Sequence, residues 1–140
     1  MKTMDITQLP FNRLIGLQRA EAPYLLSLPE SSQYHNHLGT VHASALLSVA
    51  EATSGEFLIQ SLGSIAGVIP VVRRLEAKFK KPGLGQLLGR CTAAPEVVSK
   101  LRSDLESKSR GMIELPIEVC GTDGTIFLTA EIEWFIAIQK

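Results

Sequence analysis

The sequence predicts an α+β domain in which an antiparallel β-sheet wraps around one long central α-helix. Two observations carry this prediction. The stretch from Asn36 to Leu62 is helix-forming and apolar or small almost all round, which is typical of a buried helix. Residues 111–121 and 126–138 each alternate between apolar and polar side chains and are joined by an Asp-Gly turn, as hairpin strands are. We expect residues 1–140 to form this single domain.

Composition places the chain among ordinary globular proteins. Hydrophobic residues make up 45% and charged residues 20%, with a formal net charge of zero, which argues against a dedicated nucleic-acid binder. Residues 1–11 have no apolar core of signal-peptide length, and polar residues and a proline interrupt the most apolar window, residues 57–72. Cys91 and Cys120 fit reduced core thiols. We therefore expect a cytoplasmic protein without a membrane contact.

The residues ahead of the central helix predict a short helix, a broken strand and a loop. Residues 5–14 favour a helix that is capped by Asp5 and has a small apolar side (Ile6, Leu9, Leu14). Gly16 then opens a strand over residues 17–29, which is interrupted near Ala22-Pro23. Residues 30–35 are polar and loop-like.

Turn residues mark both ends of the central helix. Asn36 and Gly39 favour a turn, Thr40 offers an N-cap, and the glycines of residues 63–67 end the helix. No charge occurs from residue 42 to residue 50, so Glu51 enters an apolar helix as a single carboxylate. Burying an ionised carboxylate costs free energy unless it reaches solvent, forms an ion pair or hydrogen bond, or serves a function. Glu51 is therefore the main catalytic candidate. We expect Glu56 to be structural.

Four strands are predicted after the helix. Residues 71–80 alternate, with Val71, Leu75, Ala77 and Phe79 on one side, and only Arg73 breaks the pattern of a half-buried strand. A Pro-Gly turn leads to a strand over residues 86–94, and the polar segment 95–111 has room for a short helix. The apolar faces of the last two strands are the clearest in the chain (Ile113, Leu115, Ile117, Val119; Ile126, Leu128, Ala130, Ile132, Trp134, Ile136, Ile138).

The central segment resembles that of hotdog-fold thioesterases. The residues that carry this resemblance are Asn36-His37-x-Gly39-Thr40-x-His42 and a carboxylate, Glu51, nine residues after the second histidine. The segment is most similar to the PaaI-like (phenylacetate-pathway) branch and its poorly characterised relatives. This family usually has His-Gly-Gly where this chain has His42-Ala43-Ser44. The resemblance extends over most of the chain. It implies a hotdog fold, an acyl-CoA substrate and no cofactor other than the coenzyme A of that substrate.

Within this resemblance, Glu51 is the expected base or nucleophile toward the thioester. The amides of His42 and Ala43 lie at the start of the helix, where backbone N–H groups lack acceptors, and suit an oxyanion hole. His42 could equally be a simple helix-start residue. Asn36 holds the position that orients substrate or water in the resemblance, or it only shapes the loop.

The spacing along the helix predicts a shared site. Nine residues at ~1.5 Å each place Glu51 about 13 Å from His42 along the axis, too far for one carbonyl group. Two antiparallel helices from two subunits can bring these groups together. We therefore expect a homodimer with two composite sites, as the resemblance also implies, and leave a homotetramer open.

The remaining expected contacts are with the substrate. They comprise small residues of the loop and helix and part of a basic cluster that suits the phosphates of coenzyme A (Gly39, Thr40, Ser54, Gly55, Arg73, Arg74, Lys78, Lys80). Such a cluster is also typical of a solvated strand face. His35, His37 and His42 lack partners at a metal-ligand spacing, so no metal is expected, and no G-x-S-x-G motif supports a serine triad.

Two other functions compete with the thioesterase. His37 lies fourteen residues before Glu51, which resembles the His/Glu pair of hotdog dehydratases, although their Pro-rich signature is missing. The non-enzyme alternative is an acyl-CoA-binding protein, in which Ala43-Ser44 closes the site. Hydrolysis assays against several acyl-CoAs separate the three.

Overall fold

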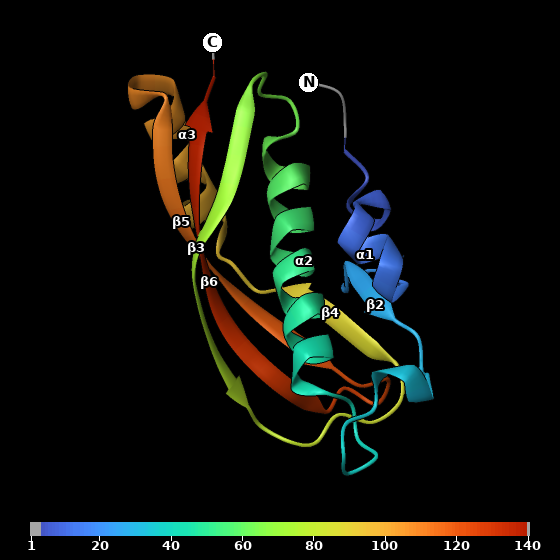
Figure 1. Cartoon of the computed structure of the whole chain (residues 1–140). Helices are drawn as coiled ribbons and strands as arrows, with labels where there is room; N and C mark the ends of the chain where they lie inside the picture. Colours follow the sequence, from blue (N-terminus) through green and yellow to red (C-terminus); the bar gives the residue numbers. More distant parts are fainter. Residues whose placement is uncertain (1–3, 140) are drawn as a thin grey trace.

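The computed structural model describes residues 4–139, so both ends of the predicted 1–140 domain lie outside the described residues. One six-stranded antiparallel sheet, in the order β1-β2-β4-β5-β6-β3, curls around α2 (Figure 1). The elements are η1 (Ile6–Gln8), α1 (Pro10–Ile15), β1 (Gln18–Arg19), β2 (Leu26–Leu28), η2 (Ser32–Tyr34), α2 (Ala43–Leu62), β3 (Val68–Phe79), β4 (Leu87–Cys91), α3 (Pro95–Lys108), β5 (Arg110–Cys120) and β6 (Ile126–Ile138).

The core lies between α2 and the concave face of the sheet, as predicted. The apolar residues of β5 and the centre of β6 that were expected to share a face are buried there, among them Leu115, Ile117 and Ile132. They pack against α2 residues such as Val49 and Leu58, which are also buried. Burying each such side chain stabilises the fold by about 1.5–3 kcal/mol. In the part of the chain that the structure describes, no helix is long and apolar enough to cross a membrane.

The single helix predicted over residues 5–14 is wrong. Asp5 does cap a helix, η1, by accepting a hydrogen bond of 3.0 Å from the Thr7 amide, but η1 ends at Gln8. Pro10 then occupies the first turn of a separate helix, α1, because proline lacks the N–H that a continuing helix needs. The break rotates the apolar side, so Leu14 is 80% exposed while Asn12 is buried.

The N-cap predicted for α2 is also wrong. Thr40 is occupied by hydrogen bonds with Asn36, and the chain enters the helix two residues later. His42 is the N-cap, and its Nδ1 accepts a hydrogen bond of 2.9 Å from the Ser44 amide. A histidine nitrogen thus does what a threonine hydroxyl was expected to do.

Arg73, the one residue that broke the predicted alternation, marks a β-bulge. The register shifts between Val72, which pairs with Trp134, and Arg74, which pairs with Glu133. Residues on opposite strands that pair share a face, so the extra residue moves Val71 to the face opposite Leu75, contrary to the prediction.

β3 is an edge strand, paired only with β6 among the described residues. Its apolar side chains are therefore more open than the half-buried strand that the sequence predicted. Ile69, Val71 and Phe79 are 43%, 49% and 51% exposed.

The segment after β4 forms a longer helix than the short one for which the sequence left room. α3 runs over fourteen residues, with a proline in its first turn and Leu101 and Leu105 buried one turn apart. Arg102 of α3 donates a hydrogen bond to the carbonyl of Ser61, near the end of α2. α3 thus closes the end of the core beside the last turn of α2.

Candidate active site

Glu51 lies on α2 at the wall of a largely apolar cavity. The cavity has a volume of about 510 Å³, and Glu51 is the one charged residue that lines it within residues 4–139. The side chain is half-buried, and burial raises the pKa of its carboxyl above the usual value of glutamate. A carboxylate that is partly stripped of water is a stronger base and suits proton abstraction near neutral pH.

Two buried side chains fix the helical turn that carries Glu51. Trp134 of β6 donates from Nε1 to Ser54 Oγ over 2.9 Å, and Ser54 Oγ donates to the carbonyl of Glu51 over 2.6 Å. Ser54 was expected to contact substrate, but it is fully buried and serves this connection between sheet and helix. The only tryptophan of the sequence, on an inner strand face, and a serine in an apolar helix each need a polar partner. From this shared need the sequence could have predicted the hydrogen bond between them.

Asn36 organises the loop ahead of α2. Its Oδ1 accepts hydrogen bonds from the amides of Leu38, at 2.9 Å, and Thr40, at 3.2 Å. Its Nδ2 donates to Thr40 Oγ1 over 3.0 Å. These bonds form an Asx-type turn, with Gly39 at a φ of 76° that glycine adopts without strain. The side chain of Asn36 is therefore committed largely to the loop.

The two amides proposed for an oxyanion hole differ in their availability. The amide of His42 already donates to the carbonyl of Tyr34 over 2.7 Å. The amide of Ala43, the first residue of α2, has no acceptor among the described residues. Of the two predicted donors, Ala43 is thus the one free to bind a developing oxyanion, at the positive end of the helix dipole.

The Ala43 end of α2 opens into a second cavity, of about 330 Å³. Asn36, Thr40 and Ala43 line one side of it, and Lys80 and its neighbour Lys81 line another. The sequence did not single out Lys81 as a site residue, although its place in the basic cluster beside Lys80 was the signal for it. The side chain of His42 does not join them, since it lines a separate pocket beneath α1.

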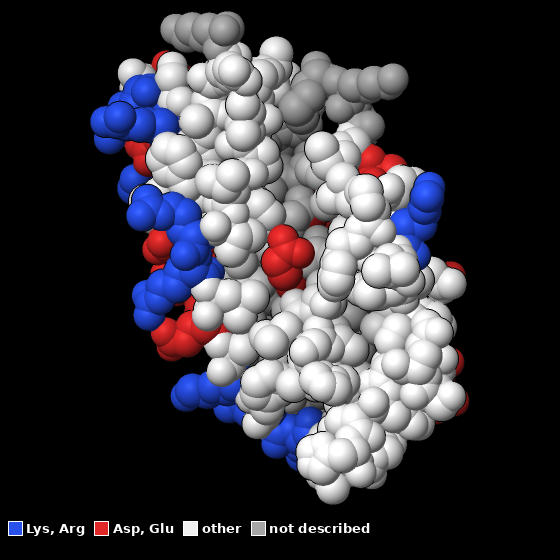
Figure 2. Space-filling model, in the orientation of Figure 1, with Lys and Arg blue, Asp and Glu red and all other residues white. Residues whose placement is uncertain are grey.

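The rest of the basic cluster lies elsewhere. Arg73 is the bulge residue, and Arg74 forms an exposed ion pair of 2.7 Å with Glu76. Neither they nor Lys78 lines the Glu51 or the Ala43 cavity. Figure 2 shows Lys and Arg gathered along the flank of the sheet, while the side over α2 is largely uncharged with acidic atoms near its middle.

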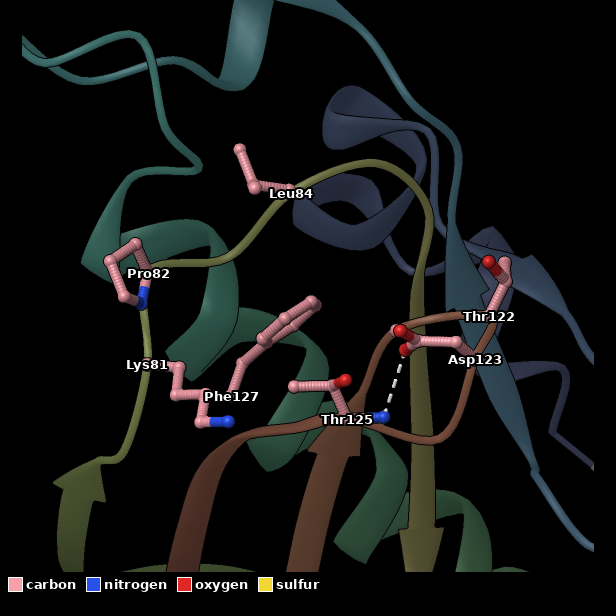
Figure 3. A pocket seen from close by; sticks show the side chains of 8 residues that line it. Lys81, Pro82, Leu84, Thr122, Asp123, Thr125 and Phe127 are labelled. Carbon is pink, nitrogen blue, oxygen red and sulfur yellow. Dashed lines mark hydrogen bonds between the residues drawn. The ribbon is translucent and has the colours of Figure 1, made fainter.

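A third hollow adjoins the Ala43 cavity (Figure 3). It has a volume of about 440 Å³ and lies between the segment after β3 and the turn that joins β5 to β6. Lys81 and Pro82 line both hollows, and the far wall here includes Asp123, Thr125 and Phe127. Asp123 Oδ1 accepts a hydrogen bond of 3.0 Å from the Thr125 amide, which fixes the turn. None of the predicted site residues lies here.

Of the predicted catalytic residues, Glu51 lines one cavity, and Asn36 and Ala43 line another that shares no residue with it. Residues 68–70, at the start of β3, line the Glu51 cavity together with Gly55. Phe79 and Lys80, at the end of β3, line the Ala43 cavity. The two cavities thus lie toward opposite ends of one edge strand, so a single copy of the chain does not bring Glu51 and the Ala43 amide to one cavity.

Two other predicted features can be placed. Glu56, expected to be structural, is buried and forms an ion pair of 3.0 Å with Arg19. His37 is exposed in the turn before α2 and lines neither cavity. Across residues 4–139, no group of three or more His, Cys, Asp and Glu side chains is arranged to hold a metal ion.

Comparison with known proteins identifies a family over most of the chain. The model of a family described as a domain of unknown function (DUF4442) matches residues 18–136. No curated protein matches the chain.

Solved structures show the fold. A Pseudomonas aeruginosa protein of unknown function, called a probable thioesterase, matches with a TM-score of 0.79 at 18% identity over 96% of this chain and 91% of its own. A Bacillus halodurans protein solved with CoA gives 0.62 at 19% identity over 79% of this chain and 65% of its own. The PaaI protein of the Escherichia coli phenylacetic acid degradation operon matches with a TM-score of 0.63 at 11% identity, over 95% of this chain and 86% of its own. The expected hotdog fold is confirmed, while the PaaI-like branch has only loose support.

Proposed function

The chain belongs to the DUF4442 family, and on that premise we propose that it hydrolyses an acyl thioester whose carrier is coenzyme A. The observation that carries the proposal is Glu51, a carboxylate of raised pKa that is the one charged group among the described residues lining an apolar cavity. The fold is shared with a probable thioesterase and with a protein solved with CoA, which agrees with this substrate.

In the proposed reaction, Glu51 takes a proton from water, and the water oxygen attacks the carbonyl carbon of the thioester. The Ala43 amide stabilises the negative charge that develops on the carbonyl oxygen. The carbon–sulfur bond then breaks, and the departing thiolate takes up the proton that Glu51 holds. Direct attack by the Glu51 carboxylate, followed by hydrolysis of the resulting anhydride, uses the same groups.

The site would be shared between two copies of the chain. β3 offers an unpaired backbone edge twelve residues long, with exposed apolar side chains. An antiparallel pairing of β3 with its copy sets the start of one strand beside the end of the other. The Glu51 cavity, at the start of β3, then meets the Ala43 cavity of the second copy, at the end of its β3. A homodimer is thus the proposed active form.

Lys80 and Lys81 are the proposed contacts for the phosphates of coenzyme A. Both line the cavity into which the Ala43 amide opens, so they lie beside the proposed carbonyl position. Lys81 also lines the adjoining hollow of Figure 3, which gives the carrier a path away from the reacting group. Ammonium groups on flexible side chains are common phosphate ligands.

The direct test is thioester hydrolysis by the purified protein. We expect free thiol to be released from acyl-CoA, and Glu51→Gln to abolish the release while the circular dichroism spectrum stays native. The matched control is Glu106→Gln, an exposed glutamate of α3, which should keep wild-type activity. Hydration of an enoyl-CoA without thiol release would support the dehydratase instead, and binding of acyl-CoA without either reaction would support a carrier. Full activity in Glu51→Gln would refute the role of Glu51.

A further inference from the structure

The N-terminal segment forms a wall of the Glu51 cavity. Met4, Ile6, Leu9 and Asn12 line it on one side, while α2 and the start of β3 line the others. Most of the remaining lining is aliphatic (Ala52, Gly55, Leu58, Ile59, Leu62, Val68, Ile69, Pro70). The volume of about 510 Å³ falls in the range, roughly 300–1,000 Å³, of pockets that enclose small ligands.

Few side chains of the cavity lining can form hydrogen bonds with a polar ligand. Asn12 and Glu51 carry the hydrogen-bonding side chains exposed to the cavity's contents, apart from the Trp134 ring. Asn12 Nδ2 already donates to the carbonyl of Ile6 over 3.0 Å, and Trp134 Nε1 to Ser54. A hydroxyl or carboxyl group placed deep in this cavity, away from Asn12 and Glu51, would lose its water without gaining a partner. The chemistry of the wall therefore selects an unsubstituted apolar group.

Arg19 fastens this wall to the central helix. One guanidinium nitrogen lies 3.0 Å from Asp5, which caps η1, and the other lies 3.0 Å from the buried Glu56 of α2. Gln60 adds a hydrogen bond of 2.8 Å to the same carboxylate of Glu56. Arg19 thus connects the segment that walls the cavity to the helix that carries Glu51.

Gly55 sets the distance between wall and helix. A Cβ atom at this position would lie 3.4 Å from Ile6 Cδ1 and 3.7 Å from the Trp134 ring. A hydrogen atom there leaves the space open, whereas a larger side chain would enter it. Residue 55 is therefore placed to control how deeply a ligand extends along α2.

From these contacts we infer that the cavity binds the apolar chain of the acyl group, and that residues 4–12 form a wall, fastened by Arg19, that limits its length. The inference rests on the proposed thioesterase function and adds its substrate class, aliphatic acyl groups without polar substituents. Glu51 stands in the cavity wall, where the thioester end of such a chain would emerge.

The test compares kcat/KM for dodecanoyl-CoA and hexanoyl-CoA. Gly55→Leu fills the cavity and should lower the dodecanoyl-to-hexanoyl ratio at least about tenfold, since a few methylenes in an apolar pocket discriminate by that factor. Leu9→Ala enlarges the cavity and should raise the ratio. The matched control is Leu14→Ala, an exposed leucine of α1 that does not line the cavity, and its ratio should not change.

A second pair of variants tests whether the ion pairs of Arg19 hold the cavity wall in place. Arg19→Gln removes both ion pairs and should loosen the wall, so that the two substrates are hydrolysed with more similar kcat/KM values. Arg13→Gln, on α1 and with no ion pair among the described residues, is the control. Unchanged ratios in Gly55→Leu and Leu9→Ala, with native circular dichroism spectra, would overturn the inference.

A binding measurement separates this inference from the proposed function. Titration of dodecanoate into the dimer by calorimetry needs no catalysis. If the wild-type chain hydrolyses no thioester but binds dodecanoate, and Gly55→Leu weakens that binding at least about tenfold, the cavity assignment stands and the thioesterase fails. Equal binding to both, or none to the wild type, would refute the cavity assignment whatever the catalytic activity.

Discussion

Trp134 Nε1 and Ser54 Oγ are joined by a buried hydrogen bond of 2.9 Å that connects β6 to α2. The same hydroxyl donates to the carbonyl of Glu51, one helical turn earlier. The carboxylate proposed for catalysis is therefore positioned by the sheet, although the residue itself lies on the helix. Glu51 needs this support because, among the described residues, its own side chain forms no ion pair that would hold it.

Ser54→Ala should destabilise the protein by about 1–3 kcal/mol, because it leaves the indole N–H of Trp134 buried without an acceptor. Urea denaturation followed by tryptophan fluorescence measures the change. Ser107→Ala is the control, since its hydroxyl also bonds to a helix carbonyl, Ser103, but on the exposed side of α3. Equal losses in the two variants would mean that the Trp134 bond adds nothing.

Glu51→Gln should increase the free energy of unfolding at neutral pH. Burial raises the pKa of Glu51 in the folded state above its unfolded value, so the folded protein binds that proton more tightly. Stability from this group is present below the unfolded pKa and is lost as the pH rises through the folded pKa. The gain from Glu51→Gln should therefore vanish in acid. Denaturation across a pH series tests this, and a wild type more stable than the variant at neutral pH contradicts it.

Charge reversal at Lys80 and Lys81 should raise KM for an acyl-CoA by roughly tenfold or more, because hydrogen bonds to charged groups contribute about 1.5–3 kcal/mol each. The same acyl group on N-acetylcysteamine, which lacks the nucleotide, should be little affected. Reversal at Arg73 and Arg74, which lie outside the Ala43 cavity, is the comparison. A larger increase of KM in the Arg73 and Arg74 variant would mean that these arginines bind the phosphates, as the sequence suggested. KM for the CoA substrate should also rise with salt.

Two inactive chains should restore activity when they share a dimer. Ala43→Pro removes the free amide at the first position of α2, where proline is well tolerated, and Glu51→Ala removes the carboxylate. In a mixed dimer, one composite site carries both lesions and the other carries neither. Random exchange makes about half the dimers mixed, so roughly a quarter of wild-type activity should return after the two proteins are refolded together.

Mass spectrometry of the refolded mixture provides the control for this experiment. If mixed dimers are present and no activity appears, each site lies within one chain. That outcome would leave the assignment of Glu51 to the separate hydrolysis test.

The fold could be predicted because its strongest signals are periodic. The helix Ala43–Leu62 and the alternating strands β5 and β6 are specified by local patterns that the core then uses. Errors arose where one residue changes the phase of a pattern. The bulge at Arg73 moves Val71 to the other face, and Pro10 divides the first helix, and neither shift follows from the hydrophobic pattern alone.

The candidate site was predicted less completely, because it depends on contacts between distant segments. Glu51 could be singled out as one charge in an apolar helix. Other contacts depend on how loops and helices pack. Examples are the hydrogen bond from the His42 amide to the carbonyl of Tyr34 and the ion pair between Arg19 and Glu56. The sequence could name the groups at the helix start, but only the fold separates the free amide from the occupied one.

The edge position of β3 has a consequence for synthesis. Among the described residues β3 pairs only with β6, and β4, α3 and β5 are made between them, so the newly made β3 waits without a strand partner until the last strand leaves the ribosome. An unpaired strand of twelve residues invites association between nascent chains. Proteolysis of ribosome-bound chains that end before residue 126 should therefore cut within β3, and protection there would show that an earlier partner shields it.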